Sequence, residues 1–537
     1  MAVFALLQPG TAMPIPTRSI RSAALLLAAC ALFAGCGVQP LSASPGSTHD
    51  DADAARRIEA DLRFLADDLL EGRQAGTRGY DLAARYVEAR FRAMGLEPGG
   101  DAGSYLRAVP MVQGLRIPDG AELVLEHDGQ RLEFAFERDF LPAIGFDVQR
   151  SRVSAPVVFV GYGVHAPEFG YDDFAGIEVE GKIALMFNGA PARFPNDPRA
   201  FHSSGREKLA ALAARGAVGA VMLSDPEREE RAPWARGARN WLTPGMRLLD
   251  EEGRPIDTFP ELQVTAAASL ETARALLAQA PGGAAAVFKD LEAGTLQPFE
   301  LPGTLTLAQR SVLEPVTSHN VVAMLPGTDP ELRLEHVVFS AHLDHVGIGA
   351  PVDGDRIYNG AYDNALGTAI MLEAARMSRD TARPRRTLVF VALTAEEKGL
   401  LGAHHFARQP GLEGRLVANL NMDMPLMFSA QDDVVPYGIE HSSLRGPTER
   451  AAARLGVQLS PDPMPEEVVF VRSDQYAFVR QGIPALYLDA GIQASEPAST
   501  PRPRPASSCA TTTTSRPTRP TCRSTTPPRC GWRGSTS

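Results

Sequence analysis

The feature that most restricts the fold is a change of pattern after Thr317. From there, apolar runs of about six residues alternate with amphipathic helical segments, the pattern of an α/β layer. The strand-like runs cover residues 336–341, 388–393 and 416–420, and a helix is expected over residues 365–375. The sequence therefore predicts an α/β fold with a mixed, mostly parallel central sheet flanked by helices.

Polar residues with metal-binding groups follow each of these strand-like runs or precede the helix. In open α/β sheets, binding sites form outside the carboxyl ends of the strands, so we expect these side chains to meet in one crevice. The residues in question are His342, Asp344, Asp363, Glu396, Glu397 and Asp423.

This set suits metal chemistry. Imidazole and carboxylate groups are nitrogen and oxygen ligands for Zn²⁺, and two zinc ions can share one bridging carboxylate. Adjacent Glu396 and Glu397 allow one carboxylate to bind metal while the other acts as a base. Each pair alone has an ordinary structural explanation, such as helix capping or favourable placement at a helix start. Four candidate ligands at successive strand or helix junctions, namely His342, Asp363, Glu397 and Asp423, together predict a metal site. We interpret His345, Glu373, His404 and His405 as structural or solvent-facing.

Four segments that carry this pattern resemble the M28 family of co-catalytic zinc aminopeptidases. They are residues 341–345 (AHLDH), 359–365 (NGAYDNA), 395–400 (AEEKGL) and 419–423 (NLNMD). The resemblance implies a zinc-peptidase fold of the phosphorylase/hydrolase-like type and two Zn²⁺ ions.

The resemblance also implies a role for each residue. Asp363 would bridge the two zinc ions, His342 and Asp423 would complete the ligands of one ion, and Glu397 would bind the other. Glu396 would be the general base, and Asp344 would orient His342. Arg472, Ser473 and Asp474 resemble a segment near the substrate pocket of the family, which often has His where this chain has Gln475.

The resemblance covers about residues 55–495 and divides them into parts. Residues 50–112 would form the N-terminal helical part, which contains Glu71, Gly72 and Arg73. Residues 113–300 read as short strands and turns with a helix, and resemble an inserted, β-rich protease-associated (PA) domain. Residues 310–498 would be the catalytic domain.

The C-terminal end departs from the family. The resemblance implies a further histidine that completes the ion bound by Glu397, but this chain has no histidine after His441. Residues 499–537 contain no Leu, Ile, Val, Met, Phe, Lys, Asp or Glu, so they cannot form a core and are predicted to be disordered. This segment is either a natural low-complexity tail or the product of a reading-frame shift. The simultaneous loss of ligand and composition favours the frame shift.

The two ends also differ from the body in charge and cysteine content. The chain has 53 Lys and Arg against 64 Asp and Glu, and residues 37–496 carry a net charge of −20 and no cysteine. Such an acidic body argues against nucleic acid as a partner, because its phosphates would be repelled.

Residues 1–36 have the pattern of an export signal. Arg18 and Arg21 precede an apolar run over residues 23–34, which is too short to span a membrane. Residues 32–36 (LFAGC) resemble a bacterial lipoprotein box, which implies lipidation of Cys36; a plain cleaved signal is the alternative. We therefore expect an exported bacterial protein, either a periplasmic or membrane-anchored lipoprotein or a secreted protein. Its contact with the membrane would be through the lipid anchor.

The resulting hypothesis is an exported zinc aminopeptidase that removes N-terminal residues from peptides with a two-metal activated water. Two alternatives stay open. A glutaminyl cyclase-like transferase would use one zinc ion and no hydrolytic water. An inactive remnant, lacking the last histidine ligand, would at most bind peptides.

Overall fold

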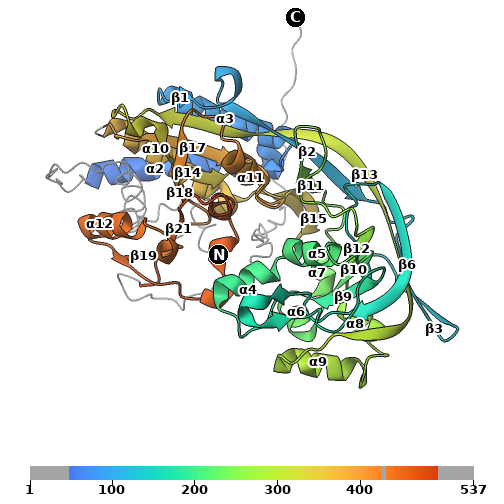
Figure 1. The fold of residues 1–537 in the computed structure, drawn as a ribbon. Helices are drawn as coiled ribbons and strands as arrows, with labels where there is room; N and C mark the ends of the chain where they lie inside the picture. Colours follow the sequence, from blue (N-terminus) through green and yellow to red (C-terminus); the bar gives the residue numbers. More distant parts are fainter. Residues whose placement is uncertain (1–47, 382, 426–430, 494–537) are drawn as a thin grey trace, which may run out of the picture.

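The computed structural model describes residues 48–381, 383–425 and 431–493. A mixed sheet forms the centre of one lobe (Figure 1), and its four middle strands are all parallel. In spatial order these are β17 (Thr387–Leu393), β14 (Glu335–His342), β18 (Arg415–Asn421) and β21 (Ala485–Ala490). The predicted fold class, a mixed and mostly parallel sheet flanked by helices, is confirmed.

Antiparallel strands extend this sheet on both sides. Next to β17 lies the end of β13 (Phe299–Leu325), which pairs in turn with β1 (Glu97–Pro98) and β2 (Leu106–Arg116). β11 (Gly245–Leu248) pairs with β2. Beyond β21, the sheet ends with β19 (Asp433–Tyr437) and β20 (Gln458–Leu459).

Alternate residues of the middle strands enter two hydrophobic cores, as the period of two along a strand requires. Phe339 and Phe390 point to one face, whereas Val338 and Val389 point to the other. Because both faces are covered, these strands read as continuous apolar runs rather than alternating ones.

Helices cover each face of the sheet. One face is packed by α2 (Thr48–Leu65), α3 (Arg78–Ala93) and α10 (Leu366–Asp380). The other face is packed by α11 (Leu401–Arg408) and α13 (Gln475–Val479). The predicted helix over residues 365–375 corresponds to α10.

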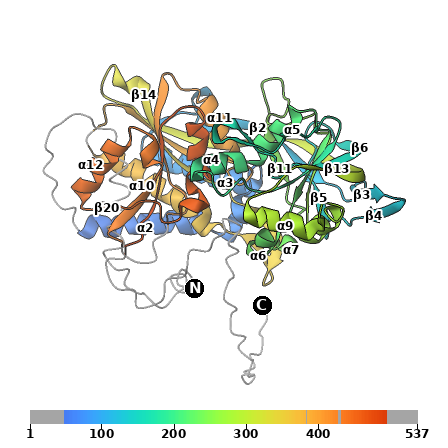
Figure 2. The same ribbon diagram turned by 60° about the horizontal axis from the view of Figure 1, so that its bottom comes forward.

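A second sheet forms the other lobe, and the two lobes lie side by side in Figure 2. Residues 299–310 of β13 belong to this second sheet, so β13 curves from one lobe into the other (Figure 1). The second sheet has its own buried cores. On one side of β13, the second sheet continues with β3 (Glu122–His127) and then β4 (Gln130–Glu133). On the other side it continues, in spatial order, with β6 (Arg150–Phe159), β9 (Ile183–Phe187), β10 (Gly219–Leu223), β12 (Val264–Ala268) and β5 (Phe140–Pro142).

Shorter elements complete the described ranges. The helices are α4 (Asn196–Ser203), α5 (Gly205–Ala213), α6 (Pro226–Arg231), α7 (Trp234–Ala238), α8 (Leu270–Leu276), α9 (Gly283–Ala293) and α12 (Arg445–Leu455). The short strands are β7 (His165–Ala166), β8 (Tyr171–Asp172), β15 (Gly347–Val352) and β16 (Asp355–Tyr358). The one-turn segments are η2 (Asp68–Arg73), η3 (Asp101–Gly103), η4 (Pro167–Phe169), η5 (Leu332–Leu334), η6 (Ala361–Ala365), η7 (Ile439–His441), η8 (Pro465–Glu467) and η9 (Val469–Val471).

Several predictions about the chain's organisation are not tested by this architecture. The signal region with Cys36 and the tail over residues 499–537 lie outside the described residues. The domain boundaries and the identity of the second lobe as a PA domain also stay predictions. Among the described helices, none combines the length and the apolar sequence that crossing a membrane requires.

Candidate metal centre

The predicted ligands lie at one edge of the main sheet. His342 ends β14, Glu396 and Glu397 follow β17, and Asp423 follows β18. These strands are parallel neighbours, so their carboxyl ends open on the same side, as the sequence pattern predicted. Asp363 reaches the same place from η6, the irregular turn before α10.

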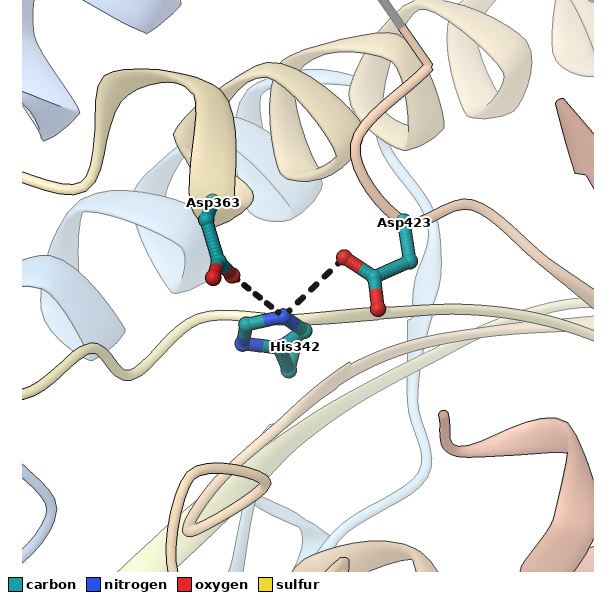
Figure 3. Close-up of side chains that lie close together, drawn as sticks. All are labelled: His342, Asp363 and Asp423. Atoms are coloured by element: carbon teal, nitrogen blue, oxygen red, sulfur yellow. Dashed lines mark hydrogen bonds and ion pairs between the residues drawn. The ribbon is translucent and has the colours of Figure 1, made fainter. Parts of the chain in front are cut away.

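His342 is the centre of the first group of ligands (Figure 3). Its Nε2 atom lies 3.1 Å from Oδ1 of Asp363 and 3.2 Å from Oδ1 of Asp423. Its Nδ1 atom lies 3.1 Å from the main-chain oxygen of Asp344, to which it can donate a hydrogen bond. This bond leaves Nε2 directed at the two carboxylates, the arrangement that orients a metal-binding imidazole.

The charge around His342 favours a cation. Burial would lower the pKa of this imidazole, but the charges of Asp423 and Glu396 and the hydrogen bonds to Asp363 and Asp423 raise it well above its ordinary value. The pKa of Asp363 lies below its ordinary value, because hydrogen bonding to His342 and the positive charges of His342, His345 and Arg73 outweigh the effect of burial. The space between these groups therefore favours positive charge, which a bound divalent ion would supply in place of the proton.

Asp344 supports the site by two routes. Its main-chain oxygen orients His342, whereas its carboxylate lies 3.9 Å from Nδ1 of that ring. The carboxylate accepts hydrogen bonds from the backbone N–H groups of Glu396, at 3.0 Å, and Glu397, at 3.3 Å. Burial raises the pKa of Asp344 to about 6, even though the charge of His342 lowers it. Asp344 therefore fixes the turn that carries both glutamates.

A second group of candidate ligands contains a residue that sequence reasoning missed. His345, Asp363 and Glu397 each offer one ligand atom, and these atoms all lie within 4.8 Å of one another. Nδ1 of His345 lies 2.6 Å from Oε1 of Glu397. Asp363 belongs to both groups, which is the position of a bridging carboxylate. The sequence offered only a weak sign of this, the position of His345 three residues after His342, where β14 ends.

Glu396 belongs to neither ligand group of the described residues. It is half-buried beside them, and burial raises its pKa well above the ordinary value for a glutamate. The charges of Asp423, Asp474 and Glu397 raise it further, whereas that of His342 lowers it. Glu396 is therefore a carboxyl group beside the candidate ligands that belongs to neither of their groups.

The segment predicted to lie near the substrate divides into three environments. Arg472 is exposed and pairs with Glu467 at 3.3 Å. Ser473 is buried and accepts a hydrogen bond from Nδ2 of Asn421 at 2.9 Å. Asp474 is fully buried, and neither of its carboxylate oxygens has a hydrogen-bond partner among the described residues. Burial raises the pKa of Asp474 to about 8, and the negative charges of Asp423 and Asp344 contribute.

Arg73 is a second residue whose part in the site the sequence did not reveal. Its buried guanidinium donates hydrogen bonds to the main-chain oxygens of Leu343 at 2.8 Å, Asn359 at 2.6 Å and Gly360 at 2.9 Å. It also donates to the main-chain oxygen of Leu65. Burial lowers the pKa of Arg73 to about 10, although nearby carboxylates raise it. Through these hydrogen bonds, Arg73 connects the loop before Asp363 with the residue that follows β14.

The second lobe forms one wall of a cavity, and the opposite wall includes residues that follow Glu397 in the sequence. The cavity has a volume of about 690 Å³ and lies beside Lys398, the residue after Glu397. His404 lines it on the same side, and Phe146 and Arg247 line it from the rest of the chain.

The residues of both groups fit zinc by type, and those around His342 also fit it by spacing. Two ligands of a tetrahedral zinc ion lie about 3.4 Å apart, close to the 3.1 and 3.2 Å separations around His342. Each group supplies one imidazole and two carboxylates, and three protein ligands leave one position for water or substrate.

Comparison with known proteins gives the following relatives. Residues 320–513 match the profile described as peptidase family M28. The chain is 28% identical over 314 residues to a glutamate carboxypeptidase 2 homolog of Caenorhabditis briggsae, a match that covers 50% of this chain and 37% of that protein. It is 27% identical over 319 residues to aminopeptidase NAALADL1 of Mus musculus, covering 50% of this chain and 39% of that protein. The chain thus spans less than half the length of these curated relatives.

One solved structure to which this chain is similar is an aminopeptidase from Aneurinibacillus sp. strain AM-1. The identity is 21% and the TM-score 0.48, with coverage of 82% of this chain and 86% of that chain.

Proposed function

We propose that this chain, whose residues 320–513 match the profile of peptidase family M28, is a zinc-dependent aminopeptidase. The match supports the family predicted from the motifs, and with it a hydrolase of the metallopeptidase class. The proposal goes further by naming the end of the peptide that is cleaved, the number of ions and the base.

One observation carries the proposal. Two ligand groups share Asp363, and Glu396 faces them without belonging to either. Residues His342, Asp363 and Asp423 would hold one zinc ion, and Glu397 with Asp363 would contribute to the other. When bound, zinc lowers the pKa of a water molecule and polarises a carbonyl oxygen.

The residues of the chain perform the proton transfers in this proposal. Glu396 takes a proton from the attacking water, and the oxygen of that water forms the new bond to the scissile carbonyl carbon. As the C–N bond breaks, Glu396 returns the proton to the leaving amine. The products are a free amino acid and a peptide shortened by one residue. Asp344 keeps Glu396 in place through the backbone N–H at 3.0 Å.

Replacing Glu396 tests this assignment. The substitution Glu396→Gln should lower the turnover of an aminoacyl p-nitroanilide by about 10²–10⁴-fold, whereas zinc content measured by mass spectrometry should stay unchanged. A matched control is Glu292→Gln on exposed α9, which should alter neither quantity. Loss of zinc together with activity would show that Glu396 is a ligand and would contradict its role as the base.

A second candidate is cleavage at the carboxyl end of a substrate, favoured by the name of one relative, a glutamate carboxypeptidase 2 homolog. The masses of the products from an unblocked peptide, the same peptide acetylated at its N-terminus and one amidated at its C-terminus separate the two. An aminopeptidase fails on the acetylated peptide, and a carboxypeptidase fails on the amidated one. Loss of ammonia without uptake of water would instead indicate glutaminyl cyclisation.

A further inference from the structure

We propose that His345 is a metal ligand, and that with Asp363 and Glu397 it forms the second metal site of this chain. The inference rests on the proposed function for the choice of zinc, but the assignment of the ligand comes from the geometry of the described residues. It gives His345 a role that the sequence patterns did not assign.

The second ligand group repeats the composition of the first. His342 lies with Asp363 and Asp423, and His345 lies with Asp363 and Glu397. Each group therefore has one imidazole and two carboxylates, with Asp363 in common. In the second group the ligand atom of the imidazole is Nδ1, which lies 2.6 Å from Oε1 of Glu397. Imidazole and carboxylate oxygens are suitable zinc ligands, and two ions sharing a carboxylate form a two-metal site.

The surrounding backbone fixes the ring of His345. The backbone N–H of His345 donates a hydrogen bond to the main-chain oxygen of Arg73 at 3.2 Å. The ring packs so closely on Gly360 that a Cβ atom at that position would lie 2.6 Å from Cγ of His345. Only glycine leaves room there, and the φ of Gly360 is +59°, a conformation that also favours glycine. The imidazole is therefore directed at Glu397 by packing that does not depend on a metal ion.

No other described histidine competes for this position. Within residues 48–381, 383–425 and 431–493, His342 and His345 are the histidines that belong to a group of candidate ligands. His441, the last histidine of the sequence, lies 3.0 Å from Asp197 instead. The imidazole available to an ion at Glu397 is that of His345.

Metal stoichiometry tests the proposal. After equilibration with zinc and removal of free metal, elemental mass spectrometry should find two zinc ions per full-length wild-type chain and one in His345→Ala. A matched control is His165→Ala, a partly exposed histidine of the other lobe that should keep two ions. Thermal unfolding of the metal-free proteins in EDTA, followed by circular dichroism, verifies that each variant is folded.

A second variant separates ligation from positioning. His345→Asn can still donate a hydrogen bond to Glu397 but lacks the imidazole, so it should also bind a single zinc ion. Two ions in either variant, with the affinity of the wild type, would overturn the proposal, and so would a single ion in the wild type. Peptide hydrolysis by a wild type holding one ion would overturn this inference and the two-ion part of the proposed function, but would leave the proposed peptidase activity standing. If the wild type binds two ions but hydrolyses no peptide, the proposed function is overturned and the assignment of His345 as a ligand is kept.

Discussion

Asp474 is a carboxyl group that the fold buries beside other acidic residues. Burial raises its pKa from 3.8 to about 8. Between these values the unfolded chain releases the proton while the folded chain keeps it, so this group lowers the free energy of unfolding as pH rises from about 4 to 8. Above pH 8 its unfavourable contribution is fully present, and below pH 4 it is absent.

Replacement of Asp474 should remove this dependence. In EDTA, Asp474→Asn should unfold with a free energy close to that of the wild type at pH 4.5 but higher by several kcal/mol at pH 8, because each pH unit between the two pKa values costs the wild type about 1.4 kcal/mol. Urea unfolding at both pH values measures the difference. Asp119→Asn, at an exposed aspartate, is the control and should give no such trend. A difference that is the same at both pH values would contradict the prediction.

The sequence predicted the position of a site residue when that residue follows the end of a predicted strand. His342, Glu397 and Asp423 each follow a buried strand, so topology alone brings them to one edge. His345 could not be assigned in this way, because sequence does not show whether a residue three places beyond a strand end turns inward. Its direction depends on contact with Gly360 and on the backbone of Arg73, which are distant along the chain.

At the level of elements, α2 and α10 are joined by one buried carboxylate. Glu373 on α10 is 3% exposed and accepts hydrogen bonds from Nε of Arg57 on α2 at 2.9 Å and from Nη2 of Arg57 at 2.7 Å. Arg376 donates to the same carboxylate at 2.6 Å. These bonds satisfy a charge that would otherwise be costly to bury.

Neutralising this carboxylate should therefore destabilise the helical layer. Glu373→Gln should lower the free energy of unfolding by about 1–3 kcal/mol, below the cost of breaking a fully buried pair because both arginines stay partly hydrated. Asp380→Asn is the matched control, since Asp380 is exposed and pairs with Arg376 at 2.8 Å, and its effect should be about 0–0.5 kcal/mol. Urea unfolding measures both. An equal decrease in the free energy of unfolding for both variants would show that the contact of Glu373 with α2 adds no measurable stability.

Elements were easier to predict than their ends. Continuous apolar runs mark strands that are buried on both faces, which is why three strands could be predicted. In the structure, each strand is longer than predicted by at most one residue at each end; the predicted ranges were 336–341, 388–393 and 416–420. The start of α10 differs from a simple capped helix. Asn364, not Asp363, accepts the hydrogen bond from the N–H of Gly367, at 2.9 Å. Asp363 is thereby free to reach both ligand groups, a detail that spacing alone does not contain.

At the level of the whole molecule, the two lobes share β13 but not their cores. Phe339 and Phe390 belong to a core of the main sheet, whereas Leu185 and Val221 belong to a core of the second. The alternation of strands and helices predicted the main sheet. The pairing of β11 with β2 joins residues 245–248 to residues 111–114, a contact between distant segments that hydrophobic periodicity does not reveal.

This separation predicts that zinc stabilises one lobe selectively. All the candidate ligands come from β14, β17, β18, their following turns and the turn before α10. A ligand at 100 times its Kd that binds only the folded state adds about 2.7 kcal/mol. Local opening is governed by the contacts of each cooperative unit. Zinc should therefore slow hydrogen exchange in β14, β17 and β18 relative to EDTA, and leave β9 and β10 nearly unchanged. Mass spectrometry of peptic fragments resolves these segments. Equal protection of both lobes would show that β13 couples them into a single unit, and would contradict the independence of their cores.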